Sequence, residues 1–146
     1  MGKVVYRTAI PQLIKALHEG AKQGVHDVAD AVQGRATQDC PTDSGFMQGT
    51  AYQLSSEGAT GDTTAGSSGG GYTAEPPEAP SDDLAVLIAY SAYYALFVHE
   101  GHHTRSGSMV AGIPWFLAAV NAITPKAAGI FTQALTAAIA DVALPE

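Results

Sequence analysis

Cysteine is almost absent from this sequence, which holds only Cys40 among its 146 residues. A single thiol excludes any disulfide within the chain. Lys3 stands near the start, but no long apolar run follows it, so we expect no secretory signal peptide. Both features are typical of proteins that fold in a reducing compartment. We therefore expect this protein to act in the cytoplasm, or wherever a particle assembled in the cytoplasm carries it.

Charge is also scarce. Only 14% of the residues are charged, compared with roughly a quarter in a typical soluble domain. Seven basic residues face fourteen acidic ones, which gives a net charge of −7, and no cluster of Lys and Arg occurs. Tight binding of phosphates requires several basic contacts together, so we expect no specific nucleic-acid binding. Because the cores of protein interfaces are depleted in charge, this composition favours contacts with other protein.

Long hydrophobic runs and most catalytic motifs are missing. Residues 106–125 carry no charge, but only residues 113–123 are densely apolar, and Pro114 and Pro125 interrupt the run. That length suits a buried helix rather than a membrane span. The glycines at 69–71 lack the lysine and spacing of a phosphate-binding loop, and no G-x-S-x-G sequence occurs. The sequence therefore predicts no membrane association, no cofactor and no catalytic residues.

One motif of catalytic type is present, because residues 99–103 read His-Glu-Gly-His-His and match H-E-x-x-H. In zinc proteases this spacing places two histidines on one helical face to bind zinc, while the glutamate activates water. Here Gly101 and the Ser/Gly-rich stretch after it make a poor helix. Ser106 and Met109 stand where the extended motif needs glycine and histidine. We expect no functional metal, and a zinc-dependent hydrolase using this motif remains a distant alternative.

The apolar pattern predicts a long first helix over residues 10–37. Apolar side chains recur there every three or four residues, and we expect this stripe to pack in the core: Ile10, Leu13, Ile14, Leu17, Ala21, Val25, Val28, Val32 and Ala36. Pro11 suits the first turn of such a helix. Pro41 ends the helix, and a tight turn with positive φ at Gly45 is expected to follow.

Residues 46–54 and 84–90 are candidate strands on either side of a segment with a different composition. Residues 55–83 contain six glycines, three prolines and six acids but no base. Such a stretch buries little apolar surface, so we expect a long flexible hairpin loop between two paired strands. Its acids, which could line a channel or face a partner, are Glu57, Asp62, Glu75, Glu78, Asp82 and Asp83.

Residues 91–101 are rich in aromatics and fit either a strand or a short helix, and residues 102–112 are expected to form a Gly/Ser loop. A helix is predicted over residues 114–123. Thr124-Pro125 then resembles the start of another helix, with an N-cap and a first-turn proline. This order predicts one α+β domain over residues 1–146, in which a long N-terminal helix and a C-terminal helix pack on a small antiparallel sheet.

Three motifs, in order along the chain, resemble the neck and tail-completion proteins of long-tailed bacteriophages, a family typified by the gene-ten product of a lambdoid phage. The first is a Pro-x-Asp-Ser-Gly turn after a long helix, formed here by Pro41, Asp43, Ser44 and Gly45. The second is Tyr-Ala-Leu-Phe-Val-His-Glu-Gly at residues 94–101, and the third is Ile-Pro-Trp-Phe-Leu at residues 113–117. The chain departs from the family pattern by lacking a basic residue just after the turn.

The resemblance implies a structural virion protein that forms a six-fold ring at the head–tail junction or the head-proximal end of the tail. Its partners would be further copies of itself and other neck, connector, tail-terminator or tail-tube proteins. DNA would pass through the ring without specific binding. Alternatives are a tail terminator or minor tail protein of the same virion, and a binding module that is not viral.

Aromatic side chains often dominate the energy of protein interfaces. On that ground we expect the subunit interface to include Tyr93, Tyr94, Phe97, Val98, Glu100, Gly101, Pro114, Trp115 and Phe116. Some of these aromatics are expected to fill the subunit's own core instead.

Overall fold

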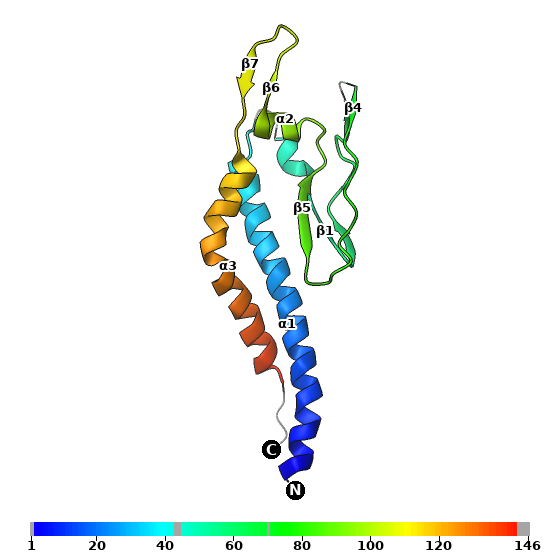
Figure 1. The fold of residues 1–146 in the computed structure, drawn as a ribbon, viewed down its shortest axis with the longest axis vertical. Coiled ribbons are helices and arrows are strands. Elements are labelled where there is room, and N and C mark those ends of the chain that lie inside the picture. Colours follow the sequence, from blue (N-terminus) through cyan, green and yellow to red (C-terminus); the bar gives the residue numbers. More distant parts are fainter. Residues whose placement is uncertain (1, 43–44, 70, 143–146) are drawn as a thin grey trace.

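Two long helices lie side by side, with a small sheet beside one of them and a β-hairpin extending beyond one end of the pair (Figure 1). The computed structural model describes residues 2–42, 45–69 and 71–142. The helices are α1 (Gly2–Asp39), α2 (Ala95–Glu100) and α3 (Trp115–Ala140), and a 3₁₀ turn, η1, covers Met47–Thr50. The strands are β1 (Ala51–Ser55), β2 (Gly58–Thr60), β3 (Ser68–Gly69), β4 (Tyr72–Thr73), β5 (Val86–Tyr90), β6 (Gly101–His103) and β7 (Met109–Ala111). The expected α+β class is confirmed.

Helix α1 is longer than the apolar pattern predicted. It begins at Gly2 rather than near residue 10, so Pro11 lies inside the helix and not in its first turn. Its end at Asp39, before Cys40 and Pro41, agrees with the sequence prediction. At 1.5 Å per residue, α1 spans about 57 Å and α3 about 39 Å. The N-terminal part of α1 therefore extends past the sheet (Figure 1).

Helices α1 and α3 pack along each other, and two glycines of α1 set their separation. A Cβ atom placed at Gly20 would lie 2.7 Å from Cβ of Ala138 and 3.2 Å from Cα of Leu135. At Gly24 the added atom would lie 2.6 Å from the ring of Phe131. Glycine at these two positions allows the helices to approach more closely than any other residue would.

Helix α3 is continuous, which corrects the predicted restart at Thr124-Pro125. Pro125 lies inside the helix. The Thr124 hydroxyl donates to the Val120 carbonyl at 2.7 Å, one turn back, and does not cap a new helix. Proline removes one backbone donor, and the packing of α3 along α1 keeps the helix in register across that gap.

The central sheet is antiparallel with the strand order β2-β1-β5. Strands β1 and β5 pair in the register Tyr52↔Ala89 and Leu54↔Leu87, so the predicted pairing of the two strands is confirmed. The first strand is shorter than expected, because residues 47–50 form η1 instead. The sheet is joined to α1 by Gln53, whose Nε2 donates to Asp30 at 2.8 Å and to Gln33 at 2.6 Å.

The described part of residues 55–83 is more structured than a loop, which corrects the prediction from composition. It contains β2, which pairs with β1, and the short hairpin of β3 and β4. It is also bonded to the segment after β5, because the Ser91 hydroxyl donates to the Ala65 carbonyl at 2.6 Å and the Tyr93 amide donates to the Gly66 carbonyl at 2.9 Å. The glycines and acids of this segment form local turns and contacts that its composition did not reveal.

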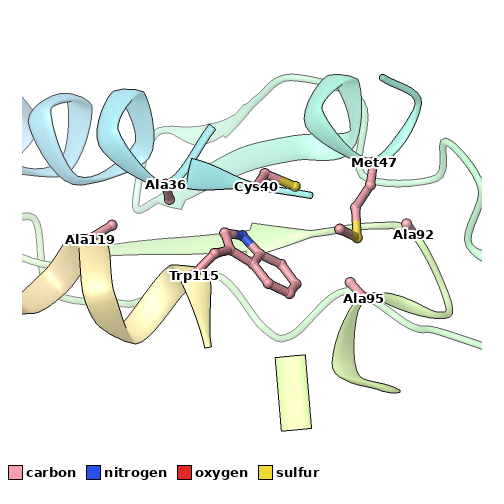
Figure 2. Close-up of a cluster of buried hydrophobic side chains, with 7 residues drawn as sticks. All are labelled: Ala36, Cys40, Met47, Ala92, Ala95, Trp115 and Ala119. Atoms are coloured by element: carbon pink, nitrogen blue, oxygen red, sulfur yellow. The ribbon is translucent and has the colours of Figure 1, made fainter. Parts of the chain in front are cut away.

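Small side chains build the buried core at the junction of α1, α2 and α3. Its members are Ala36, Cys40, Met47, Ala92, Ala95, Trp115 and Ala119. Figure 2 shows Trp115 in the middle of this cluster, between Cys40 and Ala95. Burial raises the pKa of the Cys40 thiol, because the thiolate would lose its hydration there. Small residues around one indole let three elements meet at a single point.

Candidate subunit interface

Several aromatics expected at a subunit interface lie in the subunit's own core. Trp115 is only 3% exposed, and Tyr94, Val98 and Phe116 pack against the buried cluster around it. The Tyr90 ring contacts Trp115 edge-on, with ring centroids 5.7 Å apart. The assignment of Trp115 to an interface is therefore corrected, because its ring is used in folding the monomer. Trp115 is the first residue of α3 and Pro114 precedes it at the N-cap position, so the start of the helix fixes the indole in the core.

The polar atoms of the two rings in this contact, the Tyr90 hydroxyl and the Trp115 indole nitrogen, are buried away from solvent. Neither the Tyr90 hydroxyl nor the Trp115 indole nitrogen makes a hydrogen bond of standard geometry with a described residue. Burial raises the pKa of Tyr90, and the nearby Trp115 and Thr37 side chains oppose that rise only in part. Tyr90 therefore stays neutral over the physiological pH range.

Other apolar side chains at the same end of the molecule are exposed, although the sequence analysis did not single them out as interface residues. Leu96 is 66% exposed, although it lies within the motif at residues 94–101. The remaining exposed members of this end surface are Met109, Val110, Ile113 and Leu117. A shallow hollow of about 230 Å³ lies beside Leu96, with Ile88 and Phe116 in its lining. A count of aromatics could not find this surface, because its members are aliphatic.

The other expected interface residues differ in their surroundings: some contact aromatic rings of the same subunit, some are exposed, and Gly101 begins the β6–β7 hairpin. Tyr93 stacks edge-on against Tyr94 at 5.3 Å, and Phe97 does so against Tyr72 at 5.1 Å. Glu100 and Pro114 are exposed. Gly101 has a φ of +84°, and a Cβ there would lie 2.6 Å from the Val110 carbonyl oxygen, so only glycine fits where the β6–β7 hairpin begins.

The H-E-x-x-H match does not form a helical face. His99 lies in the last turn of α2, whereas His103 lies in β6, after the positive φ of Gly101. His99 uses both ring nitrogens, because Nδ1 contacts the Glu100 carboxylate at 2.5 Å and Nε2 accepts from the Leu117 amide at 3.4 Å. Within the part of the chain that the structure describes, no three His, Cys, Asp or Glu side chains converge as metal ligands. The geometry that the motif needs for zinc is absent from these histidines.

The family-type turn after α1 has the backbone that the sequence predicted at one position. Gly45 has a φ of +70°, as expected. Asp43 and Ser44 lie outside the described residues, so the expected turn is tested only at its ends, and Pro41 is partly buried. Gln48 donates to the Thr37 carbonyl at 3.0 Å and so caps the last turn of α1. This role for Gln48 was not predicted from the sequence.

Four of the acids of residues 55–83 form ion pairs or hydrogen bonds within the subunit. Glu57 forms an ion pair with Lys22, which lowers the pKa of Glu57 and raises that of Lys22. Asp83 contacts His18 at 2.7 Å, so both pairs hold this segment against α1. Asp62 and Asp82 accept backbone amide hydrogen bonds from Thr64 and Leu84, each at 2.8 Å. The bond from the Thr64 amide lowers the pKa of Asp62.

Glu75 and Glu78 differ from these four acids. Both are exposed, and neither has a hydrogen bond or ion pair with a described residue. They flank Pro76 and Pro77 in a stretch without helix or strand. The acids are therefore not one uniform patch, because four of them stabilise the fold and two do not.

The first half of the α1 stripe is exposed, which corrects the expectation that the whole stripe packs in the core. Ile10 and Ile14 are 54% and 61% exposed, and Leu13 and Leu17 are also exposed. Only later in the helix do Val32 and Ala36 become buried. Between these parts, Val25 and Val28 line a hollow of about 360 Å³ shared with Phe131 of α3. The C-terminal part of the stripe is therefore buried in the core, and its N-terminal part is exposed on the surface.

No helix among residues 2–42, 45–69 and 71–142 has both the length and the apolar character needed to cross a bilayer. Comparisons of the chain with protein-family models, curated proteins and solved structures found no match.

Proposed function

We propose that this protein is a structural subunit of a long-tailed phage, which forms a closed ring at the head–tail junction and joins head to tail. The observation that carries the proposal is a pair of separate exposed apolar surfaces. One is the N-terminal stripe of α1, Ile10, Leu13, Ile14 and Leu17. The other is the end surface of Leu96, Met109, Val110, Ile113 and Leu117. The resemblance of the three sequence motifs supports the choice of this family for the proposal.

Two such surfaces suit a subunit that contacts different neighbours on its two ends. The stripe lies on the part of α1 that extends past the sheet, and the end surface surrounds α2 and the β6–β7 hairpin at the other end of the helical pair (Figure 1). Identical copies related by rotation bury unlike surfaces against each other, and the ring closes when the rotation divides the circle evenly. Exposed large apolar patches commonly mark such contacts.

The scarcity of charge agrees with this role. The net charge of −7 and the lack of a basic cluster give phosphates no place to bind tightly. A ring through which DNA moves needs a lining that does not retain the backbone, and negative charge repels it. Other neck, connector, tail-terminator or tail-tube proteins would then contact the exposed ends of the ring.

Imaging of the intact virion tests the location. An epitope fused after Asp141, at the end of α3, should be labelled by antibody as a collar between head and tail in electron micrographs. Labelling along the tail tube would instead identify a minor tail protein, and label absent from purified particles would refute a virion role.

A further inference from the structure

We propose that β7 of one copy pairs as a parallel strand with the free edge of β5 in a second copy, so that the sheet continues from subunit to subunit. The inference rests on the proposed ring and names the contact that would connect neighbouring subunits. Its basis is a match between two unpaired strand edges of the same chain. One edge lies beside acids, and the other lies beside a base.

The outer edge of β5 is unpaired within the subunit. β5 is the last strand of its sheet, in the order β2-β1-β5. The Ser91 amide donates to the Thr50 carbonyl, one step beyond the Ala51↔Tyr90 pair, so hydrogen-bonded pairs with β1 recur at every second residue from there. The residues of β5 whose N–H and C=O groups point away from β1 are therefore Val86, Ile88 and Tyr90. No described residue forms a hydrogen bond with these outward groups.

The opposite edge of the sheet is less suited to pairing. Strand β2 has only three residues. By the same alternation, Ala59 is its one residue that points away from β1. Short edge strands are a common means of preventing association. The sheet therefore has one edge that favours a further strand, and it is β5.

The β6–β7 hairpin extends beyond the helical pair and has no third strand (Figure 1). Every residue of β7 is exposed, and Met109 is 62% exposed. A hairpin of two strands is only marginally stable in water without further contacts. The Thr104 amide donates to the Ser108 carbonyl, one step beyond the His103↔Met109 pair. Met109 and Ala111 therefore direct their N–H and C=O groups away from β6.

The alternation along the two edges specifies a register. In a parallel pair, a residue bonds to the two neighbours of the residue opposite it. Ile88 would thus donate to the Met109 carbonyl and accept from the Ala111 amide, with Val110 opposite Ile88. Opposite side chains lie on the same face of a sheet, and Ile88 lines the hollow of about 230 Å³. Val110, 42% exposed in the free subunit, would then be covered there.

Charge favours the parallel orientation over the antiparallel one. Arg105 lies exposed at the tip of the hairpin, and residues 101–140 contain no Asp or Glu. Asp82 and Asp83 come just before β5, and Asp82 is exposed and forms no ion pair with a described residue. Because β7 begins at the tip, a parallel β7 brings Arg105 to the start of β5, where these acids lie. An antiparallel β7 would carry Arg105 to the other end of the strand.

Mixed single-cysteine variants detect this contact directly. One copy carries Ser106→Cys at the tip of the hairpin, and the other carries Leu84→Cys just before β5, where the side chain is 42% exposed. The native thiol of Cys40 is only 3% exposed and should not react in the folded protein. A short bis-maleimide should join the two variants in a concentrated mixture, whereas neither variant alone should form a linked dimer. Ala59→Cys, at the β2 edge, is the matched control and should not link to Ser106→Cys.

The other occupants of the β5 edge give different results. Linked dimers of Leu84→Cys alone would indicate β5 pairing with β5, and linked dimers of Ser106→Cys alone would indicate pairing of two hairpins. Links to Ala59→Cys as frequent as those to Leu84→Cys would indicate contact without a register. No link in the concentrated mixture would leave a different protein as the partner of this edge. Each of these results would overturn the proposal.

Removal of a single amide tests the hydrogen bonds of the pairing. Ala111→Pro removes the N–H that would donate to Ile88, while that N–H takes no part in the bonds between β6 and β7. His103→Pro removes an outward N–H from the other edge of the same hairpin and is the matched control. In sedimentation equilibrium, Ala111→Pro should weaken self-association by roughly tenfold, because a buried carbonyl loses its donor, and His103→Pro should not. Equal losses in both variants would contradict pairing through β7.

Substitution of the tip residue tests the orientation. Arg105→Glu should weaken self-association by up to about fivefold, as expected for an ion pair at the rim of an interface, and Arg105→Lys should retain it. Lys126→Glu, which changes an exposed base on α3, should have no effect. Equal effects of Arg105→Glu and Lys126→Glu would contradict the parallel orientation.

The outcome is separable from the proposed function. Linked copies of a protein that phage assembly does not need would leave the strand pairing standing without the phage role. A protein that is required for joining head to tail, but whose copies do not link, would leave the ring role and refute the pairing.

Discussion

The separation of α1 and α3 can be tested by one substitution made at two places on the same helix. Gly20 faces α3, where an added Cβ would lie 2.7 Å from Cβ of Ala138 and 3.2 Å from the backbone at Leu135. Gly34 is also inside α1, but an added Cβ there meets nothing within 4 Å. Both substitutions to alanine remove the same backbone entropy from the unfolded chain. Only Gly20→Ala creates a clash.

The expected magnitudes follow from these distances. Alanine is favoured over glycine in a helix interior by about 0.8–1 kcal/mol, so Gly34→Ala should stabilise the protein by that amount. At Gly20 the contact is roughly 1 Å shorter than the normal separation of two carbons. The atoms it meets are a Cβ and backbone, which no rotamer change can move, so the helices must shift apart at a cost of about 1–3 kcal/mol. The net effect of Gly20→Ala is therefore destabilising, by up to roughly 2 kcal/mol.

Thermal unfolding followed by circular dichroism measures the difference. With roughly 4 °C per kcal/mol for a domain of this size, Gly34→Ala should raise Tm by about 3–4 °C and Gly20→Ala should lower it. Gly129→Ala on α3, which also meets nothing within 4 Å, is a second control and should raise Tm. An equal rise of Tm for Gly20→Ala and Gly34→Ala would refute the close packing of the two helices.

Four further outcomes are expected. Gly45→Val should lower the free energy of unfolding by more than about 1 kcal/mol, because φ is +70° there, and an unchanged Tm would contradict that turn. Burial raises the pKa of the Cys40 thiol, so the stability that the neutral thiol contributes is full below the ordinary thiol pKa of about 8.5 and falls as pH rises through the raised value. Cys40→Ala should therefore flatten the fall of Tm at alkaline pH. An equally steep fall in the variant would exclude this cause. Chelation of untagged protein should leave Tm unchanged, whereas stoichiometric zinc bound through His99 and His103 would revive the hydrolase alternative. A nonspecific protease should cut the exposed residues 75–79 first, and fragments that separate afterwards would show that the pairing of β1 with β5 does not hold them together.

The sequence patterns predicted where helices and strands occur better than they predicted which elements pack against each other. The end of α1 before Pro41 and the positive φ of Gly45 were predicted from local chemistry, because proline and glycine act within a few residues. The β1–β5 pairing was predicted from two candidate strands on either side of one loop-like segment. The continuity of α3 through Pro125 was not predicted, since the packing against α1 that maintains it is non-local.

The exposure of the apolar stripe shows the same limit. Periodicity places Ile10, Ile14 and Val32 on one face of α1, and it cannot tell which part of that face another element covers. The structure buries Val32 and leaves Ile10 and Ile14 exposed, because α3 and the sheet are shorter than α1. For the same reason, the aromatic residue Trp115 was placed at an interface although the fold uses it in the core.

A phage with a nonsense mutation in the gene for this protein tests the central claim most directly. We predict that infection under nonpermissive conditions yields DNA-filled heads and complete but separate tails, and that adding the purified protein to the lysate restores joined, infectious particles. Normal joined virions from the mutant, or a block at capsid formation before DNA is packaged, would contradict a role in joining head to tail.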